Sequence, residues 1–452
     1  MTFPKVAAGS RVVVIGGGAS GVLMAAHLLS REAAGLHVTL IESRHVPGCG
    51  IAYSTPDPEH LLNTRVHNMS AFPADPHHFA HWLEGRPEGA GLDGQSFVSR
   101  ITYGAYLAGL LDPWGGIEGG ARLKVVRQEC IGLTEDATGV TARLADGSEL
   151  QADLAILATG HVLPATGDAQ VLTGAWDLEG GVAADQPVVI IGSGLSMVDQ
   201  VLSLLGQGHR GPITAVSRRG LLPRSHAPVK ALAIRAEELP EVIRASTMMA
   251  WVRAQVARAE AAGGTWRDAI DGIRPHVRAL WVRTPIDERA RFLRHATIWW
   301  DVHRHRIPPA SEARIQAARD SGQLRLLRGA FIDARPGAAG QLVARIRPHG
   351  GGADLDLPAG RVIDCRGIRR DPERNASPLM ADLFGQGRAR IDALRIGLDV
   401  APDCRILDRD GRPAARILAI GPVSRSAFWE ITAIPDIREQ VGALADQLTT
   451  AG

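Results

Sequence analysis

The chain has 452 residues, of which 45% are hydrophobic and 22% charged, and its formal net charge is +2 at pH 7. This length exceeds what one small hydrophobic core needs, so we expect two or three domains. The nearly balanced charge gives no indication of a nucleic-acid partner or a membrane surface.

The cysteines and the apolar runs bear on where the protein works. Four cysteines lie far apart without a CxxC pair, which argues against a redox dithiol, a zinc knuckle or a disulfide framework. No apolar run approaches the ~18 residues of a membrane span. The first ten residues lack the apolar core of a signal peptide. We expect a cytoplasmic protein with no membrane partner.

A buried strand, a glycine turn and a helix form the first pattern in the chain. Residues 12–15 are apolar, residues 22–29 have helical composition, and the turn between them reads Gly-x-Gly-x-x-Gly. These glycines serve a tight turn, close approach of the backbone to a pyrophosphate, and close packing of helix on strand. The candidate dinucleotide contacts are Gly16, Gly18, Ala19, Ser20 and Gly21.

A second strand over 37–41 ends at Glu42, which lies 21 residues after Gly21. At this place an acidic side chain accepts hydrogen bonds from an adenosine ribose, and Ser43 beside it is a further candidate contact. The glycine spacing alone is weak evidence, whereas strand, turn, helix, strand and terminal Glu together strongly indicate a dinucleotide site.

The loop over 63–73 is dense in side chains that can bond a flavin ring or a phosphate. Met69 and Ser70 are its candidate contacts, and an ordinary polar loop is the alternative. Asp75 then predicts the start of a helix as its N-cap. The histidines that follow have no metal-ligand spacing, so no metal site is expected.

Arg100 opens a further predicted helix and is a candidate for a cofactor phosphate. Residues 122–131 predict one strand, which ends at the candidate cofactor contact Ile131. Residues 140–148 predict the first strand and the turn of a hairpin.

The strand over 152–157 ends in three small or polar residues, Ala158, Thr159 and Gly160. Small residues at a strand end allow the backbone to press against a bound cofactor. His161 follows, and it either carries a proton in the reaction or bonds the loop backbone.

Residues 187–199 repeat the first pattern, again as strand, glycine turn and helix. The third glycine position holds Met197, so helix and strand are expected to pack slightly further apart. The candidate contacts of this second turn are Gly192, Gly194, Leu195 and Ser196.

The next strand, over 212–216, ends in Ser217, Arg218 and Arg219, where the first unit has Glu42. Arginine suits a 2′-phosphate, which a carboxylate would repel. The second unit is therefore predicted to bind NADPH; the alternative is two solvated arginines beside NADH.

Residues 230–320 are poor in glycine and have helical composition, with five of the nine tryptophans. These tryptophans either fill a core between helices, which we favour for most of them, or line a substrate cavity. The basic run over 304–309 is either a phosphate or carboxylate clamp or an exposed turn.

Strands return over 324–331, 342–346 and 361–365, and a last strand leads to Gly421. A closing helix is predicted to begin near Pro435. Its first amide groups and its positive dipole end would face an anion or the electron-rich edge of a flavin. The candidates in this segment are Gly421, Trp429, Glu430, Pro435, Asp436 and Ile437.

Several stretches spread over nearly the whole chain carry a family resemblance: 48–53, 69–76, 157–161, 194–199 and 429–435. They resemble a family of bacterial FAD/NAD(P)-binding proteins, two-dinucleotide-binding-domain flavoproteins related to N-hydroxylating and other class B flavin monooxygenases. The resemblance implies FAD in the terminal segments and NAD(P)H in an inserted middle domain.

The predicted fold is α/β, with two Rossmann-like dinucleotide-binding domains and a helical insertion. The NADP domain, 176–323 with its insertion at about 230–320, interrupts a discontinuous FAD domain formed by 1–175 and 324–452.

The resemblance implies an FAD- and NADPH-dependent oxidoreductase, most plausibly an N-hydroxylase-like monooxygenase that acts on a small molecule and O2 through a C4a-hydroperoxyflavin. No FxGxxxH…W fingerprint lies between the glycine motifs, and no CxxC follows the first unit. The alternatives are a reductase or dehydrogenase that transfers hydride without oxygenation, and a non-catalytic redox sensor or scaffold. Catalytic roles are predicted for His161, Trp429 and Glu430.

Overall fold

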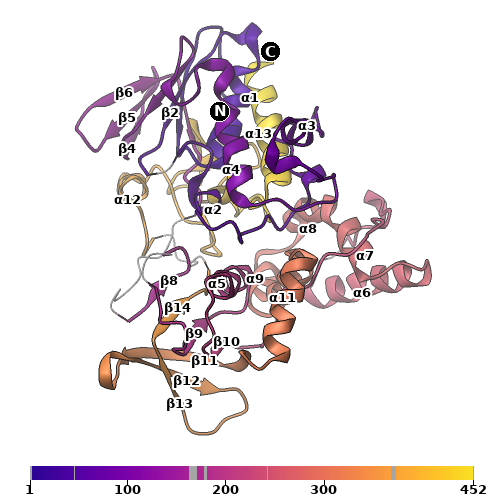
Figure 1. The fold of residues 1–452 in the computed structure, drawn as a ribbon. Coiled ribbons are helices and arrows are strands. Elements are labelled where there is room, and N and C mark those ends of the chain that lie inside the picture. The colour runs from indigo at the N-terminus through magenta and orange to yellow at the C-terminus, as the bar shows by residue number, and fades with distance from the viewer. Residues whose placement is uncertain are drawn as a thin grey trace.

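A computed structural model describes residues 3–44, 46–161, 171–177, 181–241, 243–367 and 373–450 (Figure 1). Two mainly parallel sheets with helices confirm the predicted α/β class. None of the described helices combines the length and the apolar character needed to cross a membrane.

The first sheet has six strands in the order β15-β16-β7-β1-β2-β3. All neighbours run parallel except the antiparallel pair at the β15 edge. Helices α1 (Ala19–Leu29) and α13 (Ile434–Thr449) pack against each other beside this sheet (Figure 1). The strands are β1 (Arg11–Ile15), β2 (His37–Ile41), β3 (Leu123–Val126), β7 (Leu154–Leu157), β15 (Arg405–Leu407) and β16 (Pro413–Ala419).

The second sheet has seven strands in the order β13-β12-β11-β10-β9-β14-β8. Its parallel part carries α5 (Leu195–Gly206) and α11 (Pro309–Asp320), and an antiparallel meander extends it at one edge. The strands are β8 (Thr173–Gly174), β9 (Val188–Ile191), β10 (Ile213–Ser217), β11 (Leu324–Pro336), β12 (Leu342–Pro348), β13 (Leu355–Ala359) and β14 (Arg361–Asp364).

The two sheets repeat one arrangement around their glycine turns. In the first sheet β1 lies between β2 and β7, and in the second β9 lies between β10 and β14. Each central strand ends in the glycine turn that leads into its helix. Strand β14 therefore has the place in the second sheet that β7 has in the first.

One boundary differs from the sequence-based division at 323/324. Leu324 pairs with Ile213, so β11 continues the second sheet, and β12 to β14 follow it there. The chain returns to the first sheet only with β15 and β16. The change from helices to strands at residue 324 suggested a return to the first sheet, but these strands extend the second sheet.

A small antiparallel sheet of β4 (Cys130–Glu135), β5 (Val140–Leu144) and β6 (Glu149–Ala152) contains the predicted hairpin. The single strand expected over 122–131 is wrong, because β3 belongs to the first sheet and β4 to this one.

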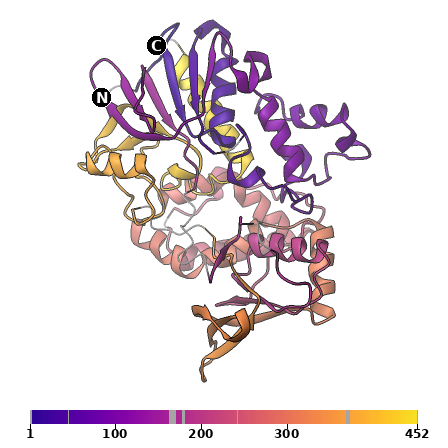
Figure 2. The same ribbon diagram turned by 60° about the vertical axis from the view of Figure 1, so that its left-hand side comes forward.

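Five helices of the insertion form a band between the two sheet units (Figure 2). They are α6 (Ala245–Ala261), α7 (Trp266–Ile273), α8 (Val277–Arg283), α9 (Ile286–His295) and α10 (Thr297–Arg304). Trp281 on α8 is buried in a core that also takes in Trp429 from the C-terminal segment. This core joins the insertion to the segment over 420–433, here called the strap, which leads into α13.

The remaining helices flank the first sheet unit: α2 (Gly50–Tyr53), α3 (His78–Glu84), α4 (Arg100–Gly109) and α12 (Pro378–Gly385). Helix α3 begins at His78 with His77 as its N-cap, two residues later than predicted from Asp75. The Asp75 carboxylate accepts a hydrogen bond from the His77 backbone in a turn instead of capping the helix.

Candidate functional site

The first glycine turn is shaped by two contacts that leave no room for a side chain. A Cβ on Gly16, whose φ is +102°, would lie 2.5 Å from the Ala158 carbonyl oxygen, and a Cβ on Gly21 would lie 1.9 Å from the Gly16 oxygen. Gly18, by contrast, faces only the Gly50 Cα at 3.5 Å. Packing requires Gly16 and Gly21, and Gly18 leaves a side of the turn open to a ligand.

The N-terminus of α1 begins at this open side. Gly18 is its N-cap and supplies no side-chain hydrogen bond, so the first amide groups of the helix receive no cap from it. The half-buried Ala19 and the buried Ser20 follow in the first turn. Uncapped amides with the positive end of the helix dipole are suited to a pyrophosphate.

Glu42 reaches back from the end of β2 to the same turn. Its Oε2 accepts a hydrogen bond of 2.9 Å from the Gly17 amide, and its Oε1 accepts one from the Arg44 amide. Ser43 beside it is exposed. The carboxylate therefore lies against the glycine turn, where a ribose-binding residue is required.

The second glycine turn has the same construction. A Cβ on Gly192, whose φ is +118°, would lie 2.4 Å from the Cys365 carbonyl oxygen, so Cys365 takes the place that Ala158 has in the first unit. Gly194 has nothing within 4 Å of its Cβ position and is the N-cap of α5 without a side-chain bond. Leu195 and Ser196, half-buried, form the first turn of the helix.

Three arginines gather at the end of β10. Arg218 and Arg219 are exposed and follow Ser217, whose Oγ accepts hydrogen bonds from Ser193 and from the Gly220 amide. Arg328 pairs with Ser217 across the sheet. Within the described part of the chain, none of the three arginines forms an ion pair with a carboxylate. Sequence reasoning missed Arg328, because only the parallel β10–β11 pairing brings it here.

Other predicted contacts in the first unit are turned into the protein. Met69 is buried, and its carbonyl accepts the Tyr103 hydroxyl. The Ser70 hydroxyl is also buried and bonds within its own loop, to Phe72 and Asp75. Their side chains therefore serve the loop. Ile131 lies on β4, outside the first parallel sheet, and is half-buried.

The strap over 420–433 brings α13 to the first turn. A Cβ on Gly421, whose φ is +65°, would lie 2.3 Å from the Ser20 hydroxyl, so the strap passes directly against α1. Helix α13 begins with Ile434, has Pro435 in its first turn and has no side-chain cap at Ala433. Its buried Ile437 and its partly buried Asp436 follow. The expected helix start is confirmed.

A charged cluster around the buried Glu430 adjoins the N-terminus of α13. Glu430 Oε1 accepts a hydrogen bond of 2.9 Å from the Trp300 indole, and Glu430 Oε2 lies 3.3 Å from Arg304 Nε. Asp436 pairs with Arg304 at 3.6 Å and with Arg274 at 3.1 Å. The insertion thus supplies the counter-charges for two carboxylates of the C-terminal segment.

These neighbours set the ionisation of the cluster. Burial alone would raise the pKa of Glu430, but His305, Arg304, the Trp300 hydrogen bond and Arg425 together hold it below its usual value. Burial, with the nearby charge of Arg425 as a smaller cause, lowers the pKa of His161 to about 4. Glu430 is therefore an anion and His161 a neutral imidazole at pH 7.

The basic run at 304–309 and Trp429 both contact the protein's own side chains. The basic run at 304–309 is a carboxylate clamp for the protein's own side chains: Arg304 holds Glu430 and Asp436, and Arg306 binds Asp271 with two nitrogens. Trp429 is buried and stacks on Trp281 with a ring separation of 4.5 Å, so its ring serves the core.

Asp301, His305 and Glu430 bring potential ligand atoms within 4.8 Å of one another, a grouping that sequence reasoning missed. The Arg304 guanidinium at 3.3 Å from Glu430 adds a fixed positive charge to this place. That positive charge opposes the binding of a metal cation by these three side chains.

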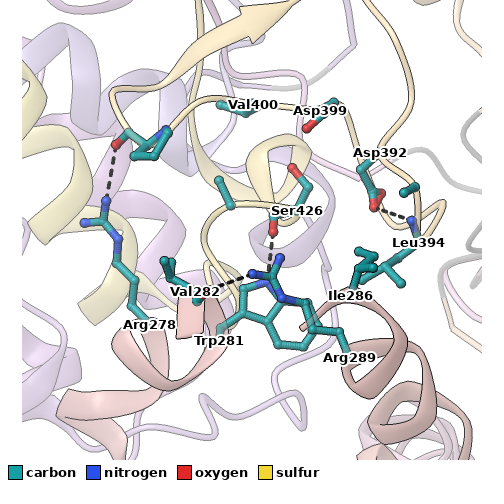
Figure 3. A pocket seen from close by; sticks show the side chains of 13 residues that line it. Arg278, Trp281, Val282, Ile286, Arg289, Asp392, Leu394, Asp399, Val400 and Ser426 are labelled. Atoms are coloured by element: carbon teal, nitrogen blue, oxygen red, sulfur yellow. Dashed lines mark hydrogen bonds between the residues drawn. The ribbon is translucent and has the colours of Figure 1, made fainter. Parts of the chain in front are cut away.

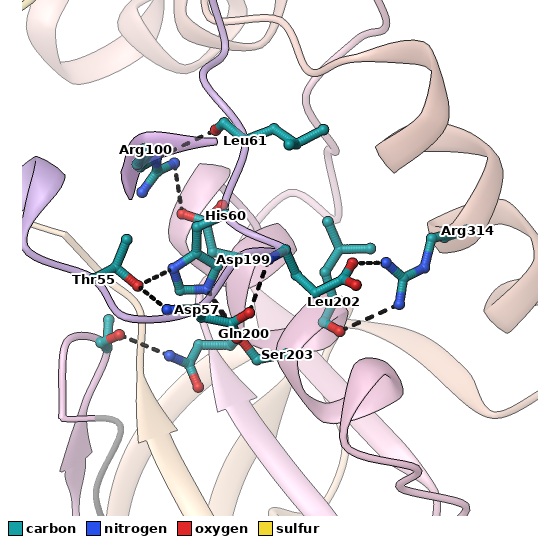
Figure 4. A network of polar contacts seen from close by, with 12 residues as sticks. Thr55, Asp57, His60, Leu61, Arg100, Asp199, Gln200, Leu202, Ser203 and Arg314 are labelled. Carbon is teal, nitrogen blue, oxygen red and sulfur yellow. Dashed lines mark hydrogen bonds and ion pairs between the residues drawn. The ribbon is translucent and has the colours of Figure 1, made fainter. Parts of the chain in front are cut away.

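A buried polar network joins the two dinucleotide-binding units (Figure 4). Arg100 on α4 lies 2.8 Å from Asp199 on α5, so it is engaged between the units rather than free for a phosphate. The His60 imidazole hydrogen-bonds the Ser203 hydroxyl at 2.9 Å, and Ser203 donates to Asp57. The network fixes the second turn relative to the first.

Residues 13–162 match the family model described as FAD-NAD(P)-binding, so an FAD/NAD(P)-binding domain forms this part of the chain. No curated protein matches the sequence significantly. The structure is similar to the reduced form of ornithine hydroxylase from Pseudomonas aeruginosa, with 16% identity and a TM-score of 0.65 over 97% of this chain and 98% of that one.

It is also similar to the FAD-bound cadaverine monooxygenase from Erwinia amylovora, with 14% identity and a TM-score of 0.64 over 98% of this chain and 94% of that one. Thioredoxin reductase from Lactococcus lactis is 14% identical, with a TM-score of 0.52 over 97% of this chain and 98% of that one. The fold is therefore that of flavoproteins with two Rossmann-like dinucleotide-binding domains.

Proposed function

We propose that the chain is an FAD-dependent oxidoreductase that uses NADPH, of the N-hydroxylating monooxygenase kind, acting on a small amine. The observation that carries the proposal is the contrast between the two turns. Glu42 adjoins the first turn. Arg218, Arg219 and Arg328 lie at the end of β10, which a Ser193–Ser217 hydrogen bond links to the second turn. A carboxylate favours an unphosphorylated ribose and arginines favour a 2′-phosphate.

The residues of the first unit fit FAD. The open side of Gly18 and the uncapped start of α1 would hold the pyrophosphate, and Glu42 the adenosine ribose. The start of α13 would face the flavin edge that becomes negative on reduction. When bound, the flavin supplies the electron-transfer and oxygen chemistry, which no side chain provides.

The charged cluster has a positioning part in this proposal. Glu430, held by Trp300 and Arg304, keeps a fixed anion beside the start of α13. His161 stays neutral at pH 7 because its pKa is lowered to about 4, so it can offer a hydrogen bond but is too weak a base to take the proton of an ammonium group, whose pKa is about 10. Glu430 itself is buried, so water has little access to its carboxylate.

The choice of an amine follows from the structural neighbours, which include an ornithine hydroxylase, an L-lysine 6-monooxygenase and a cadaverine monooxygenase. A hydride-transferring reductase is the second candidate, because thioredoxin reductases share the fold. The described chain has only cysteines that are free and form no pair, so such a reductase would not use a protein dithiol.

The test supplies purified protein with NADPH, ¹⁸O2 and a panel of amines that includes ornithine, lysine and cadaverine. The proposal predicts a yellow protein, amine-stimulated NADPH oxidation and one ¹⁸O atom in the product by mass spectrometry. Oxidation of NADPH with an artificial acceptor but without any labelled product would support the reductase. A colourless protein that takes up no FAD would overturn both candidates.

A further inference from the structure

We propose that a cavity between the insertion and the C-terminal segment binds a small organic carboxylate with an apolar body (Figure 3). The cavity has a volume of about 320 Å³. This lies at the lower end of the ~300–1,000 Å³ typical of small-molecule sites. Helices α8 and α9 form one wall, and residues 392–402 and 426–427 form the other. The inference goes beyond the proposed function and needs neither cofactor.

The apolar part of the cavity explains two unusual exposures. Val282 and Ile286 are 55% and 51% exposed, although both are large aliphatic side chains, and both line the cavity. Leu394 and Val400 line it too, and Trp281 is a further lining residue (Figure 3). A hydrocarbon body in the cavity would cover this apolar surface.

Two arginines of the cavity, Arg278 and Arg289, hydrogen-bond backbone carbonyls. Arg278 donates to the Pro402 carbonyl, and Arg289 donates to the carbonyls of Thr284 and Val282. Within the described ranges neither arginine forms an ion pair with a carboxylate. No described carboxylate lies within ion-pair distance of either guanidinium, and the Asp392 charge acts on Arg289 from further away.

The acidic residues of the cavity, in contrast, are already satisfied. Asp392 accepts hydrogen bonds from the amides of Leu394 and Ile396, and burial raises its pKa. Asp399 is held by Arg390 at 2.7 Å. The positive charges of Arg278 and Arg289 have no ion-pair partner among the described carboxylates. Guanidinium groups bind carboxylates with charge-assisted hydrogen bonds. An anionic head group is the complement.

Trp281, which lines the cavity, can report binding through its fluorescence. Trp281 donates its indole N–H to the Ser426 carbonyl at 2.8 Å, and its ring stacks on Trp429. Arg289 lies over the Trp281 ring at 5.1 Å. A carboxylate that engages Arg289 therefore changes the surroundings of Trp281, and the change is measurable as tryptophan fluorescence.

The experiment titrates the full-length protein with 4-methylpentanoate, using isothermal calorimetry together with tryptophan fluorescence. Three matched probes accompany it: 4-methylpentanamide, which lacks the charge; 4-methylpentylamine, which reverses it; and acetate, which lacks the apolar body. We expect 4-methylpentanoate to bind at least tenfold more tightly than any of the three. Equal binding of the amide or the amine, or no binding of 4-methylpentanoate, would overturn the proposal.

Variants locate the site. Arg278→Gln and Arg289→Gln are each expected to weaken binding about tenfold or more, since each removes a charged hydrogen-bond donor. Arg283→Gln is the matched control and should leave binding unchanged, because Arg283 is exposed on α8 and does not line the cavity. Val282→Phe should block the cavity mouth, whereas Ile117→Phe, at an exposed position elsewhere, should not. Equal losses in the control and cavity variants would contradict the assignment.

The outcome is separable from that of the proposed function. Calorimetry reports the carboxylate whether or not the protein oxidises NADPH. A protein that oxidises NADPH but ignores the carboxylate overturns this inference alone, and a protein that binds the carboxylate without any NADPH oxidation overturns the proposed function alone.

Discussion

Gly16 lies so close to Ala158 that a Cβ on the glycine would be 2.5 Å from the Ala158 carbonyl oxygen. The contact joins the end of β1 to the end of β7, and the equivalent contact in the second unit joins Gly192 to Cys365. Each pair holds a glycine turn against its sheet, so the shape of both turns depends on packing that is present without a ligand.

Gly16→Ala is expected to destabilise the fold by about 2 kcal/mol or more, because it combines a backbone clash with a positive φ. Urea unfolding measures this free energy. Gly194→Ala is the control: its Cβ meets nothing within 4 Å and its φ is −88°, so its unfolding free energy should stay within about 0.5 kcal/mol of the parent. Equal stability of the two variants would contradict the packing account.

Replacement of Arg218, Arg219 or Arg328 by Gln should raise the KM for NADPH about tenfold each and leave the KM for NADH nearly unchanged. Each change removes a charged donor from the edge where a 2′-phosphate would bind. Arg325→Gln, at an exposed position earlier on β11, is the control. Equal effects on both nucleotides would mean that these arginines do not read the 2′-phosphate.

Arg100→Met should destabilise the protein by about 3 kcal/mol, because it leaves the Asp199 carboxylate largely buried without its partner. The double variant Arg100→Met with Asp199→Leu should recover part of this loss, since it removes both charges together. Denaturant unfolding of the four proteins forms a double-mutant cycle. Additive losses would show that the pair does not act as a unit.

Acid should weaken the fold through His161. Its pKa is lowered to about 4 in the folded protein from 6.5, so the unfolded chain binds the proton more readily. The unfolding free energy therefore falls as the pH drops from 6.5 to 4, by up to about 3 kcal/mol from this residue. His161→Gln should be less sensitive to acid over this window. His37→Gln, at an exposed position, should retain the parent's slope.

The elements that sequence predicted well are those whose signal is local. The apolar run before Gly16, the repeated turn at Gly192 and the helix start at Pro435 each carry their own pattern of burial or turn chemistry. The misplaced boundary at 323/324 and the split strand over 122–131 depend instead on which sheet a strand joins. That choice is made by distant pairing, such as Leu324 with Ile213.

The charged contacts of the site could not be predicted from the sequence for the same reason. Glu430 and His161 were predicted as single residues, but Trp300, Arg304 and Arg425 meet them only in the folded chain. Likewise, nothing in the local pattern around Arg328 or Arg100 indicates that one lies beside Ser217 and the other binds Asp199. Long-range ion pairs leave no periodic trace in a sequence.

The central claim is that the first glycine turn holds FAD and the second holds NADPH, and one paired measurement tests it. Bound flavin, from the visible spectrum, and the dissociation constant for NADP⁺ are determined for Gly18→Ala and Gly194→Ala. Both positions are sterically open in this structure, so both variants should fold. We predict that Gly18→Ala loses flavin, and that Gly194→Ala remains yellow but binds NADP⁺ at least tenfold more weakly. Loss of flavin in Gly194→Ala with full retention in Gly18→Ala would contradict the assignment.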